Sequence, residues 1–215
     1  MLFRSFPVKS YDLTGNLEYE ISYFENGEKE IYKMYHDNGN LALIRSYRYS
    51  DNQDVISDQK EYSEDGTLQV EVSYKNEKMD GFFRVYNEEG LLQEESSFAD
   101  DQRDGVTKKY YKNGNLKLIE NYKNGKYDGP VKIFLESGGV LERHYRNGKQ
   151  EGIERAYDKN GILRSEEHYS EGKMDGIQKY YYENGNTREE YYNKGEKKYI
   201  RTYNKDGHLI SESLG

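Results

Sequence analysis

The segment YYKNGNLKLIENYKNGKYDG, residues 110–129, contains the pattern from which the architecture of the whole chain follows. Tyr110 is followed four positions later by Gly114 and six positions later by Leu116, and a second aromatic residue, Tyr122, lies near the middle of the period. The first aromatic residue recurs every 22 to 27 residues, at Tyr11, Tyr35, Tyr62, Tyr86, Tyr110, Phe134, Tyr157, Tyr181 and Tyr203. A fixed period of this length indicates a repeat array, in which each unit needs its neighbours to bury apolar surface.

Within each period apolar residues alternate with polar ones, which is typical of β-strands. The apolar side chains of one expected strand fall on a single face, in the order Leu68, Val70, Val72 and Tyr74. We therefore predict an all-β fold: an elongated single-layer antiparallel β-meander of β-hairpin repeats, each about 24 residues long, whose aromatic residues and leucines cover one face. About 17–18 strands at ~4.8 Å each would give a twisted ribbon on the order of 80 Å long.

The glycine after each first aromatic residue predicts a tight turn whose type can be derived. A two-residue type I′ turn would force a positive φ on the residue before glycine, where Thr14, Glu89 and Ser137 stand in three of the units. A type I turn with a glycine bulge needs only the glycine to be left-handed, and it pairs Tyr110 with Leu116 on one face. We therefore expect the bulged turn.

A second connection carries an acidic residue followed by glycine. It occurs in five consecutive units, at residues 78–81, 102–105, 126–129, 149–152 and 173–176, and these loops are expected to line one long edge. Their acidic residues form a row of partner-binding candidates: Asp80, Asp104, Asp128, Glu151 and Asp175. The row could bind calcium or a basic protein, or each acidic residue could only fix its turn through a side-chain to backbone hydrogen bond. Calcium needs six or more oxygen ligands, whereas each loop offers one or two carboxylates, so the turn role is favoured.

The pattern divides the chain into an N-terminal extension, residues 1–10, and a continuous repeat array, residues 11–215. Units start near residues 11, 35, 62, 86, 110, 134, 157, 181 and 203. The first two units and the last lack the acidic-glycine pair and are expected to be degenerate capping repeats. The segment RYSDNQDVISDQKE, residues 48–61, interrupts the pattern and is expected to form a polar loop.

Composition and charge exclude several classes of function. The chain has 32 basic and 40 acidic residues and a formal charge of −8, so DNA, RNA and anionic lipid should repel it. The absence of cysteine excludes disulfides, thiolate catalysis and cysteine-bound zinc. No nucleophile elbow, phosphate loop or dinucleotide fingerprint occurs, so we predict a non-enzymatic protein with no catalytic residues, no metal site and no cofactor. The start, MLFRSFPVKSYDL, lacks the apolar run of a signal peptide, so a cytoplasmic location is expected unless such a peptide has been removed.

One row of basic residues is repeated in eight units. Two positions before the first aromatic residue stand Lys33, Lys60, Arg84, Lys108, Lys132, Arg155, Lys179 and Arg201. Alternation places this basic row on the face of the tyrosines, where it could bind an acidic partner, a phosphate-bearing chain or an anionic polysaccharide. Alternatively, each cation stacks on a tyrosine and pairs with a cross-strand carboxylate. We expect such carboxylates two residues before a mid-unit aromatic, as at Glu120, Glu167 and Glu190, but other units have no acidic residue there, so pairing is not expected to be general.

Two further groups of residues stand out from the repeat. An apolar patch is expected on the face opposite the tyrosines, formed by Phe83, Val85, Val131 and Ile133. Such a patch is either the footprint of a partner or is covered where a curved sheet packs back on itself. His144 and His168 occupy equivalent positions in neighbouring units, but two strands apart is too far for both to bind one metal ion.

The double motif of residues 110–116 and 122–129 resembles the bacterial variant of the MORN repeat, and the resemblance extends over roughly residues 11 to 213. The resemblance implies an all-β repeat array without a shared catalytic residue. It also implies a protein-binding function, because many proteins of this type are antitoxins or immunity proteins that neutralise a partner toxin. The alternative is a surface or scaffold protein that binds glycan or membrane through the same repeats. A monomer is expected when no partner is bound.

Overall fold

A computed structural model of the protein describes residues 7–24, 28–50 and 53–215. All the regular secondary structure assigned in these residues is β-strand. The chain forms two compact units. The first unit comprises Met1–Gly105 and Lys109–Asn115, and the second comprises Val106–Lys108 and Leu116–Gly215. Among the described residues, no helix is long and apolar enough to cross a membrane.

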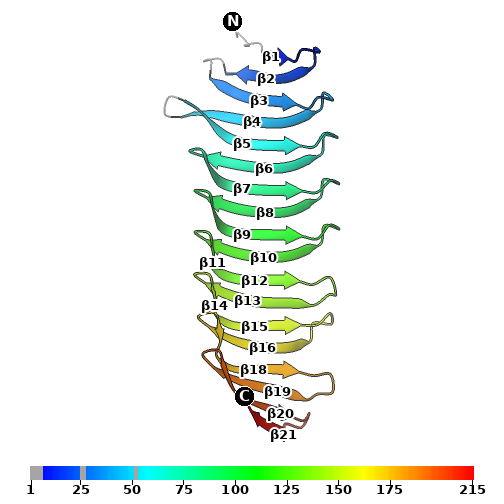
Figure 1. The fold of residues 1–215 in the computed structure, drawn as a ribbon, viewed down its shortest axis with the longest axis vertical. Coiled ribbons are helices and arrows are strands. Elements are labelled where there is room, and N and C mark those ends of the chain that lie inside the picture. Colours follow the sequence, from blue (N-terminus) through cyan, green and yellow to red (C-terminus); the bar gives the residue numbers. More distant parts are fainter. Residues whose placement is uncertain (1–6, 25–27, 51–52) are drawn as a thin grey trace. The chain divides into compact units, whose positions relative to one another are not determined.

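The first unit is an antiparallel β-meander. Its strands are β1 (Val8–Tyr11), β2 (Leu17–Tyr23), β3 (Lys29–Tyr35), β4 (Leu41–Ser50), β5 (Gln53–Tyr62), β6 (Leu68–Lys75), β7 (Lys78–Tyr86), β8 (Leu92–Ala99) and most of β9 (Gln102–Tyr110). Each strand from β1 to β7 pairs antiparallel with the next one along the chain (Figure 1). Strand β1 begins at Val8, inside the predicted N-terminal extension, of which residues 1–6 lie outside the described residues.

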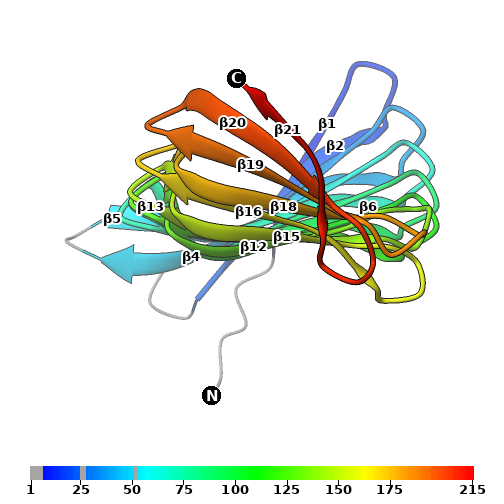
Figure 2. The same cartoon turned by 90° about the horizontal axis from the view of Figure 1, so that it is seen from below.

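The second unit has the same arrangement. Its strands are β10 (Leu116–Lys123), β11 (Lys126–Tyr127), β12 (Gly129–Phe134), β13 (Val140–Arg146), β14 (Lys149–Gln150), β15 (Gly152–Tyr157), β16 (Leu163–Ser170), β17 (Lys173–Met174), β18 (Gly176–Tyr181), β19 (Thr187–Asn193), β20 (Glu196–Tyr203) and β21 (Leu209–Leu214). Three return strands are each divided in two at an acidic-glycine pair, so counting each of them once reduces the 21 strands to 18. Figure 2 shows the strands of this unit fanning out from β12 to β20, as expected of a twisted sheet. The predicted all-β antiparallel meander is therefore confirmed.

Most turns after the first aromatic residues have the predicted bulged geometry, whereas the pairings of β12 with β13 and of β18 with β19 show no register shift. At the turn between β5 and β6, the amide of Gly66 donates to the carbonyl of Ser63 at 2.9 Å, and the amide of Ser63 donates to the carbonyl of Thr67 at 2.9 Å. Gly66 has a φ of 89°, while the residue before it is not left-handed. The register shifts next to Tyr62, which faces Leu68 as predicted. These turns form one edge of each unit, which we call the tyrosine-turn edge.

The acidic-glycine pairs do not form the opposite turns, which corrects the prediction. Between β6 and β7 the turn consists of Asn76 and Glu77, with φ values of 51° and 64°, and two consecutive positive values are typical of a type I′ turn. Asp80 and Gly81 follow within the return strand, where Gly81 has a φ of 106° and a Cβ on it would collide with the hydroxyl of Ser73. Each acidic-glycine pair is therefore an irregularity within a return strand, where the glycine has a positive φ that favours this residue.

The segment 48–61 is not a polar loop, which corrects a second prediction. Its described residues extend β4 and β5 into a long hairpin, in which Tyr47 faces Ile56 and Arg48 faces Val55. Val55 is one of the few buried apolar residues of the first unit. Residues 51 and 52 lie outside the described residues. The insertion therefore lengthens two strands instead of forming a loop, and the side chain of Val55 is buried in the added part of the hairpin.

The first and mid-unit aromatic residues lie on opposite faces of the sheet rather than on one face. In the pairing of β6 with β7, Val72 faces Phe83, so the neighbouring Arg84 and the first aromatic residue Tyr86 point to the other side. The register shifts at this place, because Val85 faces Glu94 and Tyr86 faces Leu92, so Gln93 of β8 is the extra residue that changes the face. We call the side of Arg84 and Tyr86 the ion-pair face, the side of Val72 and Phe83 the core face, and use the same names for equivalent positions in both units.

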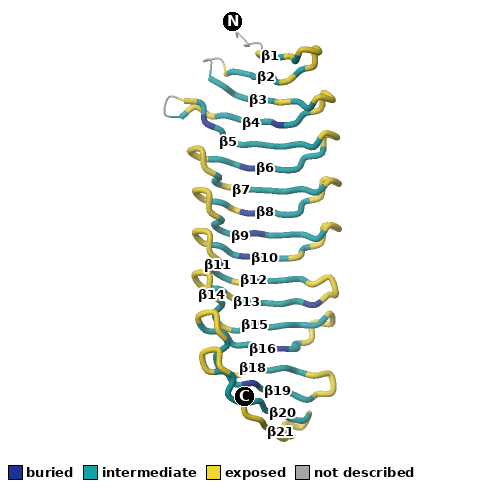
Figure 3. Tube along the Cα trace, in the orientation of Figure 1, coloured by how far each residue is buried: buried dark blue, intermediate teal, exposed yellow. Residues whose placement is uncertain are grey.

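Most buried residues lie within the strands, and the turns are largely exposed (Figure 3). The buried apolar residues are few: Leu43, Val55 and Val72 in the first unit and Val131 in the second. Buried polar residues outnumber them and include Thr107 and Gln178, which are completely inaccessible to solvent. A thin core of this kind must rely on cross-strand pairs for much of its stability.

The bulged turn gives a first testable prediction. Replacing Gly66 with Ala should reduce the free energy of unfolding by about 1–2 kcal/mol, because an added Cβ meets no atom within 4 Å and the cost is that of the left-handed backbone alone. Gly66→Asn should cost less, because asparagine tolerates this conformation better. Denaturant unfolding would measure both, with Glu64→Ala in the same turn as the control. Equal stability of the Gly66→Ala variant and the wild type would contradict the assigned turn.

Candidate protein-binding surface

The basic row forms a ladder of ion pairs on the ion-pair face of the first unit. The Lys33 Nζ atom lies 2.8 Å from a carboxylate oxygen of Glu20, and the Lys60 Nζ atom lies 2.8 Å from one of Glu71. Arg84 approaches the same Glu71 carboxylate from the other neighbouring strand, at 3.5 Å. A buried carboxylate thus holds cations from the strands on both of its sides.

The second unit has the same kind of ladder. Its pairs, with their N–O distances, are Lys132 with Glu142 (2.9 Å), Arg155 with Glu166 (3.0 Å), Lys179 with Glu189 (3.3 Å) and Arg201 with Glu212 (3.0 Å). Lys108 also has an interaction partner. The expectation that pairing is not general was therefore wrong.

The carboxylates that precede a mid-unit aromatic stand three residues before it rather than two. At a bulged turn the extra residue moves the facing residue by one position, as for Lys60 and Glu71. The pairings of Lys132 with Glu142 and of Lys179 with Glu189 reach the same position without a register shift, because the connecting segment is one residue shorter.

Tyrosine hydroxyls complete the ladder. The Tyr86 hydroxyl donates to Glu71 at 2.6 Å, and the Tyr181 hydroxyl donates to Glu166 at 3.1 Å. Burial and the hydrogen bond to Glu71 raise the pKa of Tyr86 to about 12. Burial also acts to raise the pKa of the Glu71 carboxyl, but hydrogen bonds from Lys60 and Tyr86 outweigh it, so this pKa lies below its ordinary value. The carboxylates of the ladder therefore neutralise most of the positive charge that the basic row could offer to a ligand.

The core face of the second unit carries carboxylates that are hydrogen-bonded in a different way. Glu120 accepts hydrogen bonds from the hydroxyls of Tyr127 at 2.6 Å and Tyr122 at 3.1 Å. The rings of these tyrosines lie 4.7 Å apart. Farther along, the Arg143 Nε atom lies 2.7 Å from a Glu154 carboxylate oxygen. Glu167 and Glu190, which we expected together with Glu120 to neutralise the basic row, likewise accept hydrogen bonds from the hydroxyls of Tyr169 and Tyr192, each at 3.0 Å.

The four residues of the predicted apolar patch belong to the core face. Phe83 faces Val72 across the strands, and its ring centroid lies 5.8 Å from that of Phe98. Val131 is only 5% exposed, and neither Val85 nor Ile133 is exposed. These residues pack against side chains of neighbouring strands, so the structure offers no open apolar surface at this place.

Three members of the acidic row connect neighbouring repeats. Asp128 accepts a hydrogen bond from the amide of Asn147 at 3.0 Å, Glu151 accepts one from Glu171 at 3.1 Å, and Asp175 accepts one from Lys194 at 3.0 Å. Each acceptor therefore holds the type I′ turn of the next unit, rather than its own turn as we expected. The described residues contain no group of three or more His, Cys, Asp or Glu side chains that could hold a metal ion.

An apolar strip lies beside the ion pairs of the second unit. It is formed by the residue that follows glycine in each acidic-glycine pair: Val106, Pro130, Ile153 and Ile177. Val106 is 42% exposed and Ile177 is 36% exposed, and Ile177 faces Tyr191. The Tyr191 ring stacks on Tyr199 at 5.3 Å. This strip was not predicted from the sequence, although an apolar residue follows each of these glycines.

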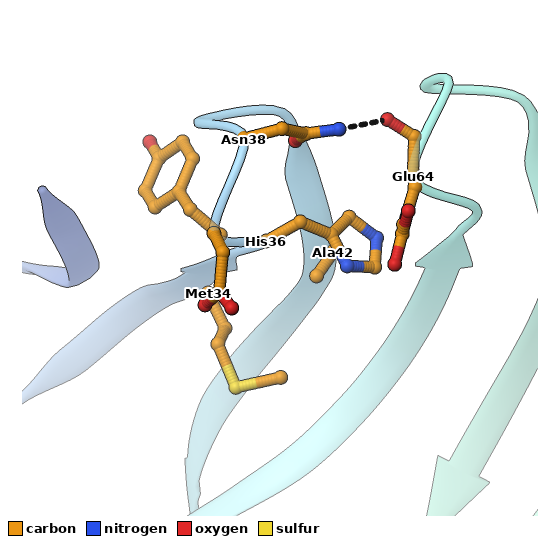
Figure 4. A pocket seen from close by; sticks show the side chains of 7 residues that line it. Met34, His36, Asn38, Ala42 and Glu64 are labelled. Carbon is orange, nitrogen blue, oxygen red and sulfur yellow. Dashed lines mark hydrogen bonds between the residues drawn. The ribbon is translucent and has the colours of Figure 1, made fainter.

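A hollow lies on the tyrosine-turn edge of the first unit. It has a volume of about 370 Å³ and is lined by Met34, Tyr35, His36, Asp37, Asn38, Ala42 and Glu64. Figure 4 shows the Asn38 side chain, which donates to the Glu64 carbonyl at 2.7 Å, and the exposed Met34 side chain. The His36 Nε2 atom is 2.9 Å from the carbonyl of Tyr62, so this histidine links two turns.

Comparison with known proteins identifies the repeat. A family model described as "MORN repeat variant" matches residues 7–26, 31–49, 58–76, 103–124, 150–171 and 174–193, more than half of the chain. The first two matched segments cover units that lack the acidic-glycine pair. The comparison with curated proteins finds no match. Among solved structures, the chain is similar to the TCP10 domain of CPAP from Danio rerio, with 16% identity and a TM-score of 0.30 over 97% of this chain and 95% of that chain, a likeness too low to support an argument.

The ladder predicts an acid-sensitive contribution to stability. The ionised Glu71 carboxylate stabilises the fold above its unfolded pKa, and this contribution is lost as the pH falls through the lowered folded pKa. Glu71→Gln should therefore reduce the free energy of unfolding by about 1–3 kcal/mol at neutral pH, and by less in acid. Chemical denaturation between neutral and acidic pH would measure the difference. Glu88→Gln, at an exposed turn, is the control, and a Glu71 variant that matched it would contradict the ladder.

Proposed function

Because this chain belongs to the family of the MORN repeat variant, we propose that it is a protein-binding repeat protein that acts as an antitoxin or immunity protein, neutralising a partner toxin by direct contact. The repeats supply a regular surface that is well suited to binding.

The observation that carries this proposal is the apolar strip of the second unit. Val106 and Ile177 are exposed at equivalent positions of different repeats, and within the described part of this unit the cations of the basic row are held by carboxylates or other partners. Consecutive members of such a strip are spaced ~10 Å apart when two strands separate them. A row of apolar side chains beside neutralised ion pairs is suited to the centre of a protein interface, where charged residues are depleted.

The charge of the chain supports a basic partner. The formal charge is −8, and exposed carboxylates of the first unit gather on its tyrosine-turn edge at Asp37, Glu64, Asp65, Glu88 and Glu89. Such a surface would speed association with a basic protein and would make the association rate fall as salt is added.

The proposal is tested in two steps. Proteins captured from a lysate of the source organism at low and high salt would first be identified by mass spectrometry. A captured partner would then be expressed alone and together with this chain. We expect a stoichiometric partner that arrests growth alone and is tolerated when the chain is present. No protein partner at low salt, or a partner without toxicity, would contradict the antitoxin role.

The strip is tested with matched variants of the same chain. Ile153→Asp combined with Ile177→Asp should weaken binding of the partner by tenfold or more, on the order expected for charges in an interface centre. Ile162→Asp is the control, because Ile162 is exposed at the tyrosine-turn edge and lies outside the strip. Titration calorimetry would measure affinity, and circular dichroism would confirm folding. Equal loss in both variants would show that the strip is not the interface.

A further inference from the structure

Two strands of the described chain are paired along one side only. Strand β21 pairs with β20, and strand β1 pairs with β2. All six residues of β21 are exposed, as are three of the four residues of β1. Within residues 7–24, 28–50 and 53–215 no strand pairs with the other side of β1 or β21, so that side can pair with a further strand.

The ladder on the ion-pair face is incomplete at β21. In the interior of the first unit, Glu71 receives Lys60 from the preceding strand and Arg84 and Tyr86 from the following one. At β21 the equivalent carboxylate is Glu212, which Arg201 contacts from the preceding strand at 3.0 Å. Among the described residues no following strand reaches Glu212, and its side chain is 43% exposed.

Strand β1 carries the side chains that such a following strand would supply. Lys9 stands two positions before Tyr11, so these residues occupy the places of Arg84 and Tyr86 in the repeat. The Tyr11 side chain is exposed, and Lys9 lies 3.8 Å from Glu20, its neighbour on the paired side of β1. In the interior, Glu71 faces Arg84 directly, and the same register would place Glu212 opposite Lys9.

We propose that β21 of one molecule binds β1 of a second copy of this chain, antiparallel and with Glu212 opposite Lys9. The Tyr11 hydroxyl would then donate to Glu212, as the Tyr86 hydroxyl does to Glu71. This inference is independent of the proposed toxin partner. Because the two surfaces differ, the contact is heterologous, and a molecule that joins through one of its edge strands still offers the other to a further copy.

The contact is a weak one. Strand β1 has four residues, and Pro7 before it has no amide hydrogen to donate, so the new strand pair is short. A surface of this size falls below that of stable protein complexes. On this proposal the chain is monomeric when dilute and assembles only as its concentration rises.

A charge-swap experiment on the full chain tests the register. Lys9→Glu places two carboxylates opposite each other in the proposed contact, and Glu212→Lys places two ammonium groups there, so each variant alone should remain monomeric. An equimolar mixture restores opposite charges at every contact between the two variants. The unchanged Glu212 of the first variant meets the unchanged Lys9 of the second, and the two introduced side chains meet each other. Sedimentation velocity over a wide concentration range should therefore show a growing series of species for the wild type and the mixture, and monomer for each variant.

The controls separate the proposed contact from a general effect of charge and from unfolding. Lys112→Glu and Glu88→Lys make the same charge changes at exposed turns and should leave the association unchanged. Thermal unfolding followed by circular dichroism would verify that both edge variants are folded. A wild-type protein that stays monomeric at all concentrations, a series that stops at the dimer, or a mixture that does not recover association would each overturn the proposal.

Discussion

A sheet of one layer has no second layer against which its side chains can be buried, and this constraint shapes the rest of the structure. Side chains can bury surface only against neighbours on adjacent strands, so cross-strand pairs replace a conventional core. The chain has few buried apolar residues, whereas buried carboxylates such as Glu71, Glu120 and Glu190 are held by tyrosine hydroxyls and cations. The abundance of tyrosine follows, because its ring covers apolar area while its hydroxyl satisfies a carboxylate.

The repeat period and the alternation of residues were sufficient to predict the architecture. Glycine after Tyr62 required a left-handed turn, and the turn is bulged as predicted. The same bulge explains the main error. An extra residue changes the face on which the following residues lie, so that Phe83, expected on the far side, faces Val72, and the partner of Lys60 is Glu71. Alternation predicts which residues of one strand share a face, but pairing across a bulge needs the register, which a single strand does not contain.

The candidate surface was predicted less completely than the fold. The basic row was visible in the sequence, but its neutralisation depends on residues from adjacent strands. The position of the acidic-glycine pairs also depends on contacts with a neighbouring strand. Gly81 was expected in a turn because aspartate and glycine are common in turns. The turn is instead made by Asn76 and Glu77. Gly81 lies within the return strand, where Ser73 leaves no space for a Cβ. The apolar strip was missed because isolated exposed apolar residues are ordinary, and only their recurrence beside neutralised cations gives them significance.

The ladder also determines where the charge of the chain can act. Ion pairs neutralise the centre of the ion-pair face locally, so the excess of acidic residues is not spread over it evenly. In the first unit the exposed carboxylates concentrate at turns, as at Glu64 and Glu88, where water and salt screen them readily. Charges of this kind attract a partner over a distance but contribute little once contact is made. On the proposed function, association and discrimination would therefore depend on different parts of the chain: the turns would provide the long-range attraction, and the apolar strip would provide the surface on which a complementary protein is distinguished from one that is only basic.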